Sequence, residues 1–262
     1  PGSARERPLP GSRGESVRVS ECVGGRGDEV MEAELFHITR EPTELSTSGM
    51  SPLLVLIHGY GSNEEDLMGL APYLDGRFRI VSVRGPQQLG QGGYSWFSLD
   101  ITPAGLTVSH DEGISSRSRL MAFITGLQER YAAAGSTTYL LGFSQGATMA
   151  VSAGLVDAAG SAGVVSLSGV CVPELIPPDG GGVEGEALRG KPFLMTHGRA
   201  DPVVPIQAGR AFHRRLQALP LDLVYREYDM GHEINHECLA DLAAWLHGQI
   251  EGGGSVRTDS PV

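Results

Sequence analysis

Short apolar runs recur along the chain, and longer segments with one apolar and one polar face separate them. Continuous apolar runs of roughly 4 to 8 residues are typical of strands that are buried on both faces of a parallel sheet. Longer segments with apolar positions at helical spacing are typical of helices that cover such a sheet. Their alternation predicts an α/β protein with a mostly parallel central sheet and helices on both faces.

The predicted elements follow one another closely from the first strand to the last helix. Strands are expected at residues 33–39, at an edge of the sheet, and at residues 52–57, 79–83, 139–141, 162–167, 192–196 and 221–228. Helices are expected at residues 67–74, 111–134, 147–156, 206–219 and 235–250. Between them, residues 84–97 contain several glycines and a proline, so we expect a long loop of the kind that often carries function.

The two ends of the chain differ in composition from its centre. Residues 1–30 are rich in Gly, Pro, Ser, Arg and Glu and contain few apolar residues. Such a segment cannot bury enough apolar surface to offset the entropy lost on ordering. We therefore expect a disordered N-terminal tail over residues 1–30, one catalytic domain over residues 31–250, and a flexible C-terminal tail over residues 251–262.

Composition and charge narrow the class of protein. The chain has 262 residues, 40% of them hydrophobic, which is enough for one large domain with a sizeable core. Its net charge of -11 argues against binding to nucleic acid, because nucleic-acid-binding domains are usually basic. No apolar run reaches the roughly 18 residues of a membrane span, so stable membrane insertion is not expected. Three distant cysteines, Cys22, Cys171 and Cys238, favour a reducing, cytoplasmic location over a disulfide framework.

A glycine-rich turn, Gly-Phe-Ser-Gln-Gly at residues 142–146, connects the predicted strand 139–141 to the predicted helix 147–156. In a G-x-S-x-G turn between a strand and a helix, the serine is held in a strained conformation with its hydroxyl exposed. The flanking glycines have no Cβ atom that would collide with the neighbouring strand or helix. We therefore predict that Ser144 is a nucleophile and that backbone N–H groups at the helix start face the same side.

A serine hydroxyl needs a base within hydrogen-bond distance before it becomes a useful nucleophile at neutral pH. The base is commonly a histidine oriented by a carboxylate, and in this type of sheet the chain order is serine, acid, histidine. Ser144, Asp201 and His232 occur in that order, each in a loop after a predicted strand. Because the carboxyl ends of parallel strands lie at one edge of the sheet, these loops are expected to converge. Asp229 is the second candidate for the acid.

Hydrolysis of an acyl group also needs backbone N–H groups that stabilise the negative charge on the substrate oxygen. The residue after the nucleophile usually supplies one of them, which is Gln145 here. The loop after the strand 52–57 contains Gly59 and Gly61, which allow a close approach of the backbone. We expect the N–H group of Tyr60 in this loop to supply the second.

Several motifs together resemble the carboxylesterase/phospholipase family of serine hydrolases, which includes acyl-protein thioesterases. They are LIHGYG at residues 56–61, GFSQGA at 142–147, SG at 168–169, HGRADPVVP at 197–205 and GH at 231–232. The resemblance spans most of residues 50–250. It implies the α/β-hydrolase fold and cofactor-free hydrolysis of esters or thioesters through an acyl-enzyme. The implied roles are nucleophile for Ser144, base for His232, orienting acid for Asp201, and oxyanion amides for Tyr60 and Gln145.

The resemblance also implies where the substrate binds. Trp96 and Phe97 match a Trp-Phe segment near the acyl site of the family, so we expect both to contact the substrate. Phe97, Leu99 and Ile101 could line an acyl channel, with ordinary loop packing as the alternative. Family members often carry leucine at the position of Tyr60, so the pocket wall is expected to differ. The expected partner is a small-molecule ester or thioester, and the sequence is also compatible with a homodimer.

A second motif, His-Glu-Ile-Asn-His at residues 232–236, matches the zinc-protease pattern H-E-x-x-H. A zinc protease carries both histidines on one helix and a third ligand further along the chain. Here Gly231 precedes the first histidine and Asn235 has the character of a helix N-cap, so His232 is expected in the loop before the helix. No metal or cofactor is therefore expected. The sequence also leaves open lysophospholipase or peptidase activity on the same three side chains, and a binding protein of the same fold.

Overall fold

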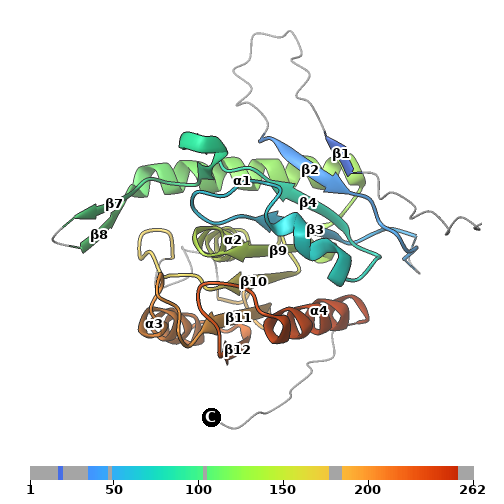
Figure 1. Cartoon of the computed structure of the whole chain (residues 1–262). Coiled ribbons are helices and arrows are strands. Elements are labelled where there is room, and N and C mark those ends of the chain that lie inside the picture. The colour runs from blue at the N-terminus through green and yellow to red at the C-terminus, as the bar shows by residue number, and fades with distance from the viewer. Residues whose placement is uncertain (1–16, 20–34, 47–48, 103–104, 177–184, 253–262) are drawn as a thin grey trace, which may run out of the picture.

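A computed structural model of the chain describes residues 17–19, 35–46, 49–102, 105–176 and 185–252 (Figure 1). Its central sheet contains β1 Val17–Val19, β2 His37–Arg40, β3 Leu53–Ile57, β4 Arg79–Val83, β9 Thr138–Phe143, β10 Gly163–Leu167, β11 Pro192–Gly198 and β12 Asp222–Tyr228. The strand order of this 8-stranded sheet is β1-β2-β4-β3-β9-β10-β11-β12. The strands from β4 to β12 in this order are all parallel, whereas β2 is antiparallel to β4 and β1 to β2.

The helices cover both faces of the sheet, as the alternation of elements predicts (Figure 1). They are η1 Leu67–Tyr73, η2 Gly90–Gly92, α1 His110–Tyr131, η3 Gly135–Thr137, α2 Gln145–Val156, α3 Ile206–Gln217 and α4 His236–Ile250. The side chains of Leu53, Val55 and Ile57 pack in one core with α1, α2 and α3, whereas Leu54 and Leu56 pack in another with η1 and α4. Because successive side chains of a strand point to opposite faces, one apolar run supplies both cores.

Two small hairpins that were not predicted from the sequence lie outside the central sheet. The first joins β5 Gln87–Gln88 and β6 Tyr94–Ser95, within the segment expected to be a long loop. The second joins β7 Leu99–Thr102 and β8 Gly105–Val108 and projects from one end of the sheet (Figure 1). Both hairpins are short and lack continuous apolar runs, so the pattern that identified the other strands did not reveal them.

The N-terminal region differs from the prediction. Only Val17–Val19 of the expected disordered tail is described, and it forms β1, whose pairing joins Val17 to Arg40 and Val19 to Ile38. This corrects two expectations: three residues of the tail belong to the sheet, and β2 is not the edge strand. The rest of the tail, like most of the expected C-terminal tail, lies outside the described residues.

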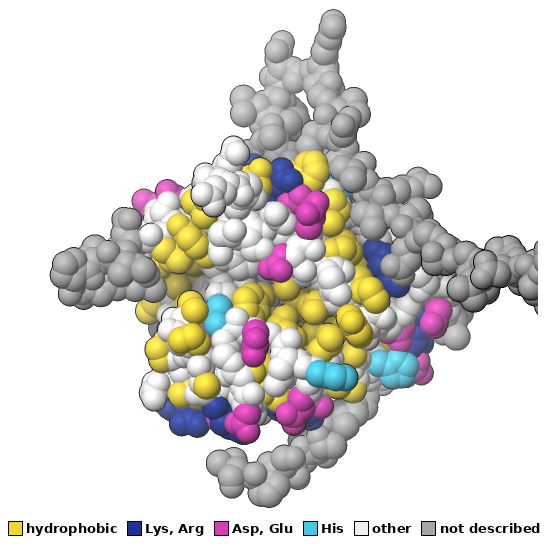
Figure 2. All heavy atoms as spheres, in the orientation of Figure 1, with side chains coloured by type: hydrophobic (Ala, Val, Ile, Leu, Met, Phe, Trp, Pro, Cys, Tyr) yellow, Lys and Arg dark blue, Asp and Glu magenta, His cyan; other side chains and the backbone are white. Residues whose placement is uncertain are grey.

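The helices and surface bear on the expected partners. Within the described part of the chain, no helix is both long and apolar enough to cross a membrane. On the face seen in Figure 2, hydrophobic and acidic side chains occupy the centre, and Lys and Arg side chains lie at the margins. Cys171 and Cys238 are free thiols, and Cys22 lies outside the described residues.

Candidate active site

Ser144 occupies the sharp turn between β9 and α2. Its backbone has φ 54 and ψ -116, a conformation that L-residues rarely adopt and that stores strain at functional sites. A Cβ atom at Gly142 would lie 2.1 Å from the Gly146 carbonyl oxygen, and one at Gly146 would lie 2.0 Å from the Ile57 carbonyl oxygen. Both glycines are therefore required by the close approach of strand, turn and helix, as the motif predicts.

The structure brings the three predicted side chains together, although they come from three different loops. The Nε2 atom of His232 lies 2.9 Å from the Ser144 hydroxyl, and its Nδ1 atom lies 2.7 Å from a carboxylate oxygen of Asp201. The carboxylate can only accept, so Nδ1 donates to it and Nε2 remains free to accept the serine proton. The Phe143 ring packs against the imidazole with 4.9 Å between the ring centroids.

The carboxylate of Asp201 is buried and is held by its own turn. One oxygen accepts from the backbone N–H groups of Val203 and Val204 at 2.9 and 2.8 Å, which leaves the other oxygen for the imidazole. The alternative acid, Asp229, forms a surface ion pair with Arg199 at 2.8 Å instead. The geometry therefore favours Asp201 over Asp229 as the partner of the histidine.

His197 supports the same turn, a role that was not predicted from the sequence. Its Nε2 atom lies 2.8 Å from the carbonyl oxygen of Val204, and the ring is fully buried. Gly209 of α3 packs directly against this ring, because a Cβ atom there would lie 2.4 Å from the His197 Nδ1 atom. The H-G-R-A-D motif could have indicated this role, since its histidine lies only a few positions before Asp201 in the sequence.

The two expected oxyanion donors lie on either side of Ser144. Gln145 is the first residue of α2, where backbone N–H groups have no intrahelical acceptor and the helix dipole favours negative charge. On the other side, a Cβ atom at Gly59 would lie 3.3 Å from the Ser144 Cβ atom, so the loop after β3 contacts the serine. The N–H group of Tyr60 has no hydrogen-bond partner among the described residues, whereas that of Gly61 donates to Tyr94.

Trp96 and Phe97 lie next to this region, but their placement differs from the expectation. Their exposed fractions are 0% and 2%, and both side chains pack in the core with α1 and α2. In this structure they line no open surface, so a direct contact of Trp96 with the substrate is not supported. Leu99 packs against the same core, and the side chain of Ile101 lies outside the described set.

His58 occupies a different setting from His232. The Gly85 N–H group donates to its Nε2 atom at 2.9 Å, so its Nδ1 atom carries the proton and donates to the Gly59 carbonyl at 2.7 Å. Burial lowers the pKa of His58, because the charged form would lose its hydration. The residue is thus a neutral support of the loop that contacts Ser144.

The zinc-protease alternative does not fit the fold. Helix α4 begins at His236, and the side chain of its N-cap residue Asn235 accepts from the Cys238 N–H group at 2.8 Å. His232 lies before this helix and faces Ser144, so the two histidines of the motif do not share a helix face. No cluster of potential metal-binding side chains occurs among the described residues.

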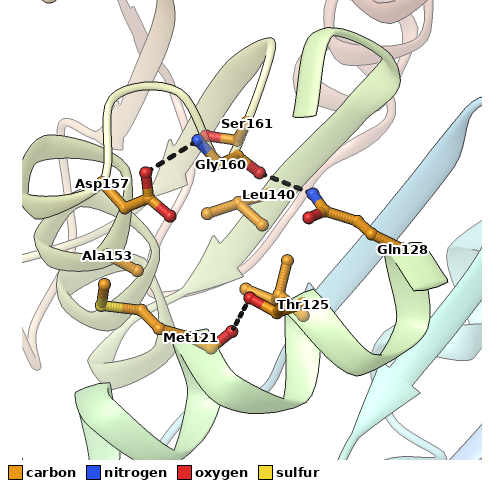
Figure 3. A pocket seen from close by; sticks show the side chains of 9 residues that line it. Met121, Thr125, Gln128, Leu140, Ala153, Asp157, Gly160 and Ser161 are labelled. Atoms are coloured by element: carbon orange, nitrogen blue, oxygen red, sulfur yellow. Dashed lines mark hydrogen bonds between the residues drawn. The ribbon is translucent and has the colours of Figure 1, made fainter. Parts of the chain in front are cut away.

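A small pocket lies at the opposite edge of the sheet, between α1 and α2 (Figure 3). Its apolar lining includes Met121, Leu140 and Ala153, and its polar rim is closed by hydrogen bonds around Gly160. The pocket lies against the C-terminal part of α2, at Ala153 and Asp157, whereas Ser144 precedes the first residue of that helix. The pocket therefore plays no part in the candidate active site.

Comparison with known proteins places the chain in a protein family. A sequence profile of the phospholipase/carboxylesterase family matches residues 42–250, which is most of the chain and includes every site residue above. The chain belongs to this family. As a phospholipase/carboxylesterase family member it is an enzyme of the α/β-hydrolase fold.

Two curated relatives and one solved structure agree with this assignment. This chain is 31% identical over 115 residues to acyl-protein thioesterase 1 of Gibberella zeae, a match that covers 42% of this chain and only 46% of that relative. It is 26% identical over 235 residues to a probable carboxylesterase of Oryza sativa subsp. japonica, covering 82% and 96% of the two chains. The crystal structure of esterase PE8 superposes with a TM-score of 0.65 at 29% identity and covers 80% of this chain and 98% of that one.

Proposed function

We propose that this chain is a serine hydrolase that cleaves carboxylic esters or thioesters of acyl chains. The observation that carries the proposal is the continuous hydrogen-bonded series from Asp201 through His232 to Ser144. This series ends on a serine in a strained turn at the positive end of a helix, where an attacking hydroxyl and a developing oxyanion are both stabilised.

In the first half of the reaction, the Ser144 Oγ atom attacks the carbonyl carbon of the substrate while its proton moves to His232 Nε2. The carbonyl electrons move to oxygen, and the N–H groups of Gln145 and Tyr60 stabilise the resulting negative charge. The C–O or C–S bond then breaks, and the leaving alkoxide or thiolate takes the proton from Nε2. While His232 carries this proton, the Asp201 carboxylate stabilises the imidazolium.

In the second half, a water molecule attacks the acyl-enzyme while His232 accepts its proton. The tetrahedral intermediate collapses, the acid product leaves, and the proton returns to Ser144. These steps need only the side chains and backbone groups named above, so the mechanism includes no cofactor.

The substrate class is inferred from the surroundings of the serine and from the relatives. Two exposed apolar side chains, Tyr60 and Val203, lie on the loops that carry an oxyanion amide and the acid. Exposed apolar side chains on these loops suit an acyl chain better than a charged substrate. The names of the relatives include a thioesterase and a probable carboxylesterase, which supports an acyl ester or thioester as the small-molecule substrate.

The test is a series of p-nitrophenyl esters and acyl thioesters of increasing chain length, with lysophospholipids and peptides as alternative substrates. We expect hydrolysis of the esters or thioesters, and a loss of about 10⁶-fold in kcat for Ser144→Ala. A fluorophosphonate probe should label the natural chain and not the variant. Full activity of Ser144→Ala, or a folded chain that neither reacts with the probe nor hydrolyses any substrate, would contradict the proposal.

A further inference from the structure

The side chain of Gln145 is buried, although the proposed mechanism uses only its backbone N–H group. Its amide oxygen accepts from the Trp96 N–H group at 2.8 Å, and its amide nitrogen donates to the Phe97 carbonyl at 2.7 Å. The first residue of α2 is therefore fixed at two points to a segment almost fifty residues earlier in the chain. A solvated turn residue would need no such attachment.

Trp96 continues the connection to the other side of Ser144. Its indole N–H group donates to the carbonyl oxygen of His58 at 3.0 Å, and its own carbonyl accepts from the Ser116 hydroxyl of α1. Together with the Gln145 bond, these contacts use the N–H, the carbonyl and the indole nitrogen of this one residue. A buried Trp whose polar groups are all satisfied in one arrangement resists displacement, because moving it leaves them unpaired.

The carbonyl of His58 immediately precedes the loop that contains Gly59 and Tyr60. The imidazole of His58 is itself fixed between Gly85 and Gly59, so the start of the loop cannot turn freely. We name the side chains of Gln145 and Trp96 with the His58 carbonyl the Trp96 network. It joins the residue that carries one expected oxyanion N–H to the segment that carries the other.

We propose that the Trp96 network is a positioning device that sets the separation of the Gln145 and Tyr60 N–H groups. This inference rests on the proposed function and adds roles for the Gln145 side chain and for the Trp96 indole. Both act through the backbone and neither touches the substrate, which reassigns Trp96 from substrate contact to positioning.

The physical reason is that oxyanion donors accelerate a reaction only when they are already in place. Loss of one donor typically lowers kcat by about 10²- to 10³-fold. A displacement of about 1 Å can lower the rate about 10²-fold, even when the change lies away from the reacting atoms. The network has no role in holding the ground-state substrate, so its loss should lower kcat and leave KM almost unchanged.

The experiment compares Gln145→Met, Trp96→Phe and the double variant with the natural chain. Methionine keeps the length of the side chain and the backbone N–H group but removes both hydrogen bonds. Phenylalanine removes the indole donor and part of the buried ring, and it keeps the backbone N–H and carbonyl groups of residue 96. Ser152→Ala is the matched control. Ser152 lies in α2, as Gln145 does, and its hydroxyl donates a buried hydrogen bond to the Leu175 carbonyl. The rates are expressed per site titrated with a fluorophosphonate, so that misfolded protein does not contribute.

We expect kcat per titrated site to fall about 10- to 100-fold in each single variant, with KM within about threefold. Affinity for a boronic acid inhibitor, which forms a tetrahedral adduct with the Ser144 hydroxyl, should fall in parallel with kcat/KM, as a loss confined to the transition state requires. Because both side chains act through one connection, the double variant should lose much less than the product of the single losses. Ser152→Ala should lower thermal stability and leave kcat unchanged.

Unchanged kcat per titrated site in Gln145→Met, or fully multiplicative losses in the double variant, would overturn the positioning role. The same holds if Ser152→Ala lowers kcat as much, because the effect would then be a general consequence of lost stability. An active Ser144→Ala variant would instead overturn the proposed function itself, so the two failures are distinguishable.

Discussion

The two sides of Ser144 are built differently. On one side, the His232 side chain is 15% exposed and is hydrogen-bonded to the Asp201 carboxylate. Two backbone N–H groups of the turn after Asp201 hold this carboxylate in place. On the other side, Gln145, Trp96 and His58 are almost completely buried and are joined by hydrogen bonds between distant segments. In the proposed mechanism the first side, called the histidine side, supplies reactive side chains, and the second, called the oxyanion side, supplies backbone N–H groups.

This difference implies that substitutions on the two sides affect rate and stability differently. On the first side, a substitution that keeps the hydrogen bonds of the Asp201 turn should change the rate with little effect on folding. A buried side chain that positions a backbone group supports the fold as well, so its loss affects both rate and stability. The comparison predicts different signatures for substitutions on the two sides.

The largest expected effect is on the histidine side, with Asp201→Asn. Asparagine can keep the two backbone hydrogen bonds through its oxygen, but its amide group would face His232 and favour the wrong tautomer. We expect kcat to fall about 10⁴-fold, while the thermal midpoint changes little. Steady-state kinetics and thermal unfolding measure the two quantities.

The matched control is Asp229→Asn, which removes the surface ion pair with Arg199 and should leave kcat unchanged. A larger loss of kcat in Asp229→Asn than in Asp201→Asn would show that Asp201 is not the acid that orients His232.

A smaller effect is expected from Gly59→Ala on the oxyanion side. The new methyl group would lie 3.3 Å from the Ser144 Cβ atom and 3.4 Å from the Phe143 carbonyl oxygen, so the loop must shift by a few tenths of an ångström. We expect kcat to fall about 10-fold, with a modest loss of stability. Gly69→Ala in η1 is the control, because nothing lies within 4 Å of the added atom. Equal rates for both variants would show that the loop tolerates displacement.

The smallest expected effect concerns the pH dependence of stability through His58. Burial holds its folded-state pKa below the ordinary value of about 6.5, so below that pH the unfolded chain binds a proton that the folded chain excludes. Its contribution to stability is complete above pH 6.5 and is lost as the pH falls toward the folded-state pKa. The slope from this one group is at most about 1.4 kcal/mol per pH unit.

His58→Gln removes this titration, so urea unfolding between pH 5 and 7 should show a shallower slope for the variant. Parallel curves for the two proteins would mean that His58 protonates equally in both states. In that case the oxyanion side would be less isolated from solvent than its burial indicates.

Much of the fold follows from the apolar runs themselves. Runs such as residues 53–57 can be buried only between two helical layers, so the parallel strands and the helices that follow them were predicted within a few residues. The prediction failed where local signals are weak. Val17–Val19 is too short to stand out in a polar tail, and its pairing with β2 depends on a neighbour more than fifteen residues away.

In the candidate site, too, some features follow from local sequence and others depend on distant segments. Local sequence was enough to predict that Ser144 lies in a strained turn, that His232 precedes a capped helix, and that Asp201 follows a strand, because glycines, caps and apolar runs act over a few residues. Their meeting follows from the common edge of a parallel sheet. The partners of Gln145 and Trp96 could be decided only by the tertiary structure, because a buried hydrogen bond pairs whichever donors and acceptors the packing of distant segments brings together.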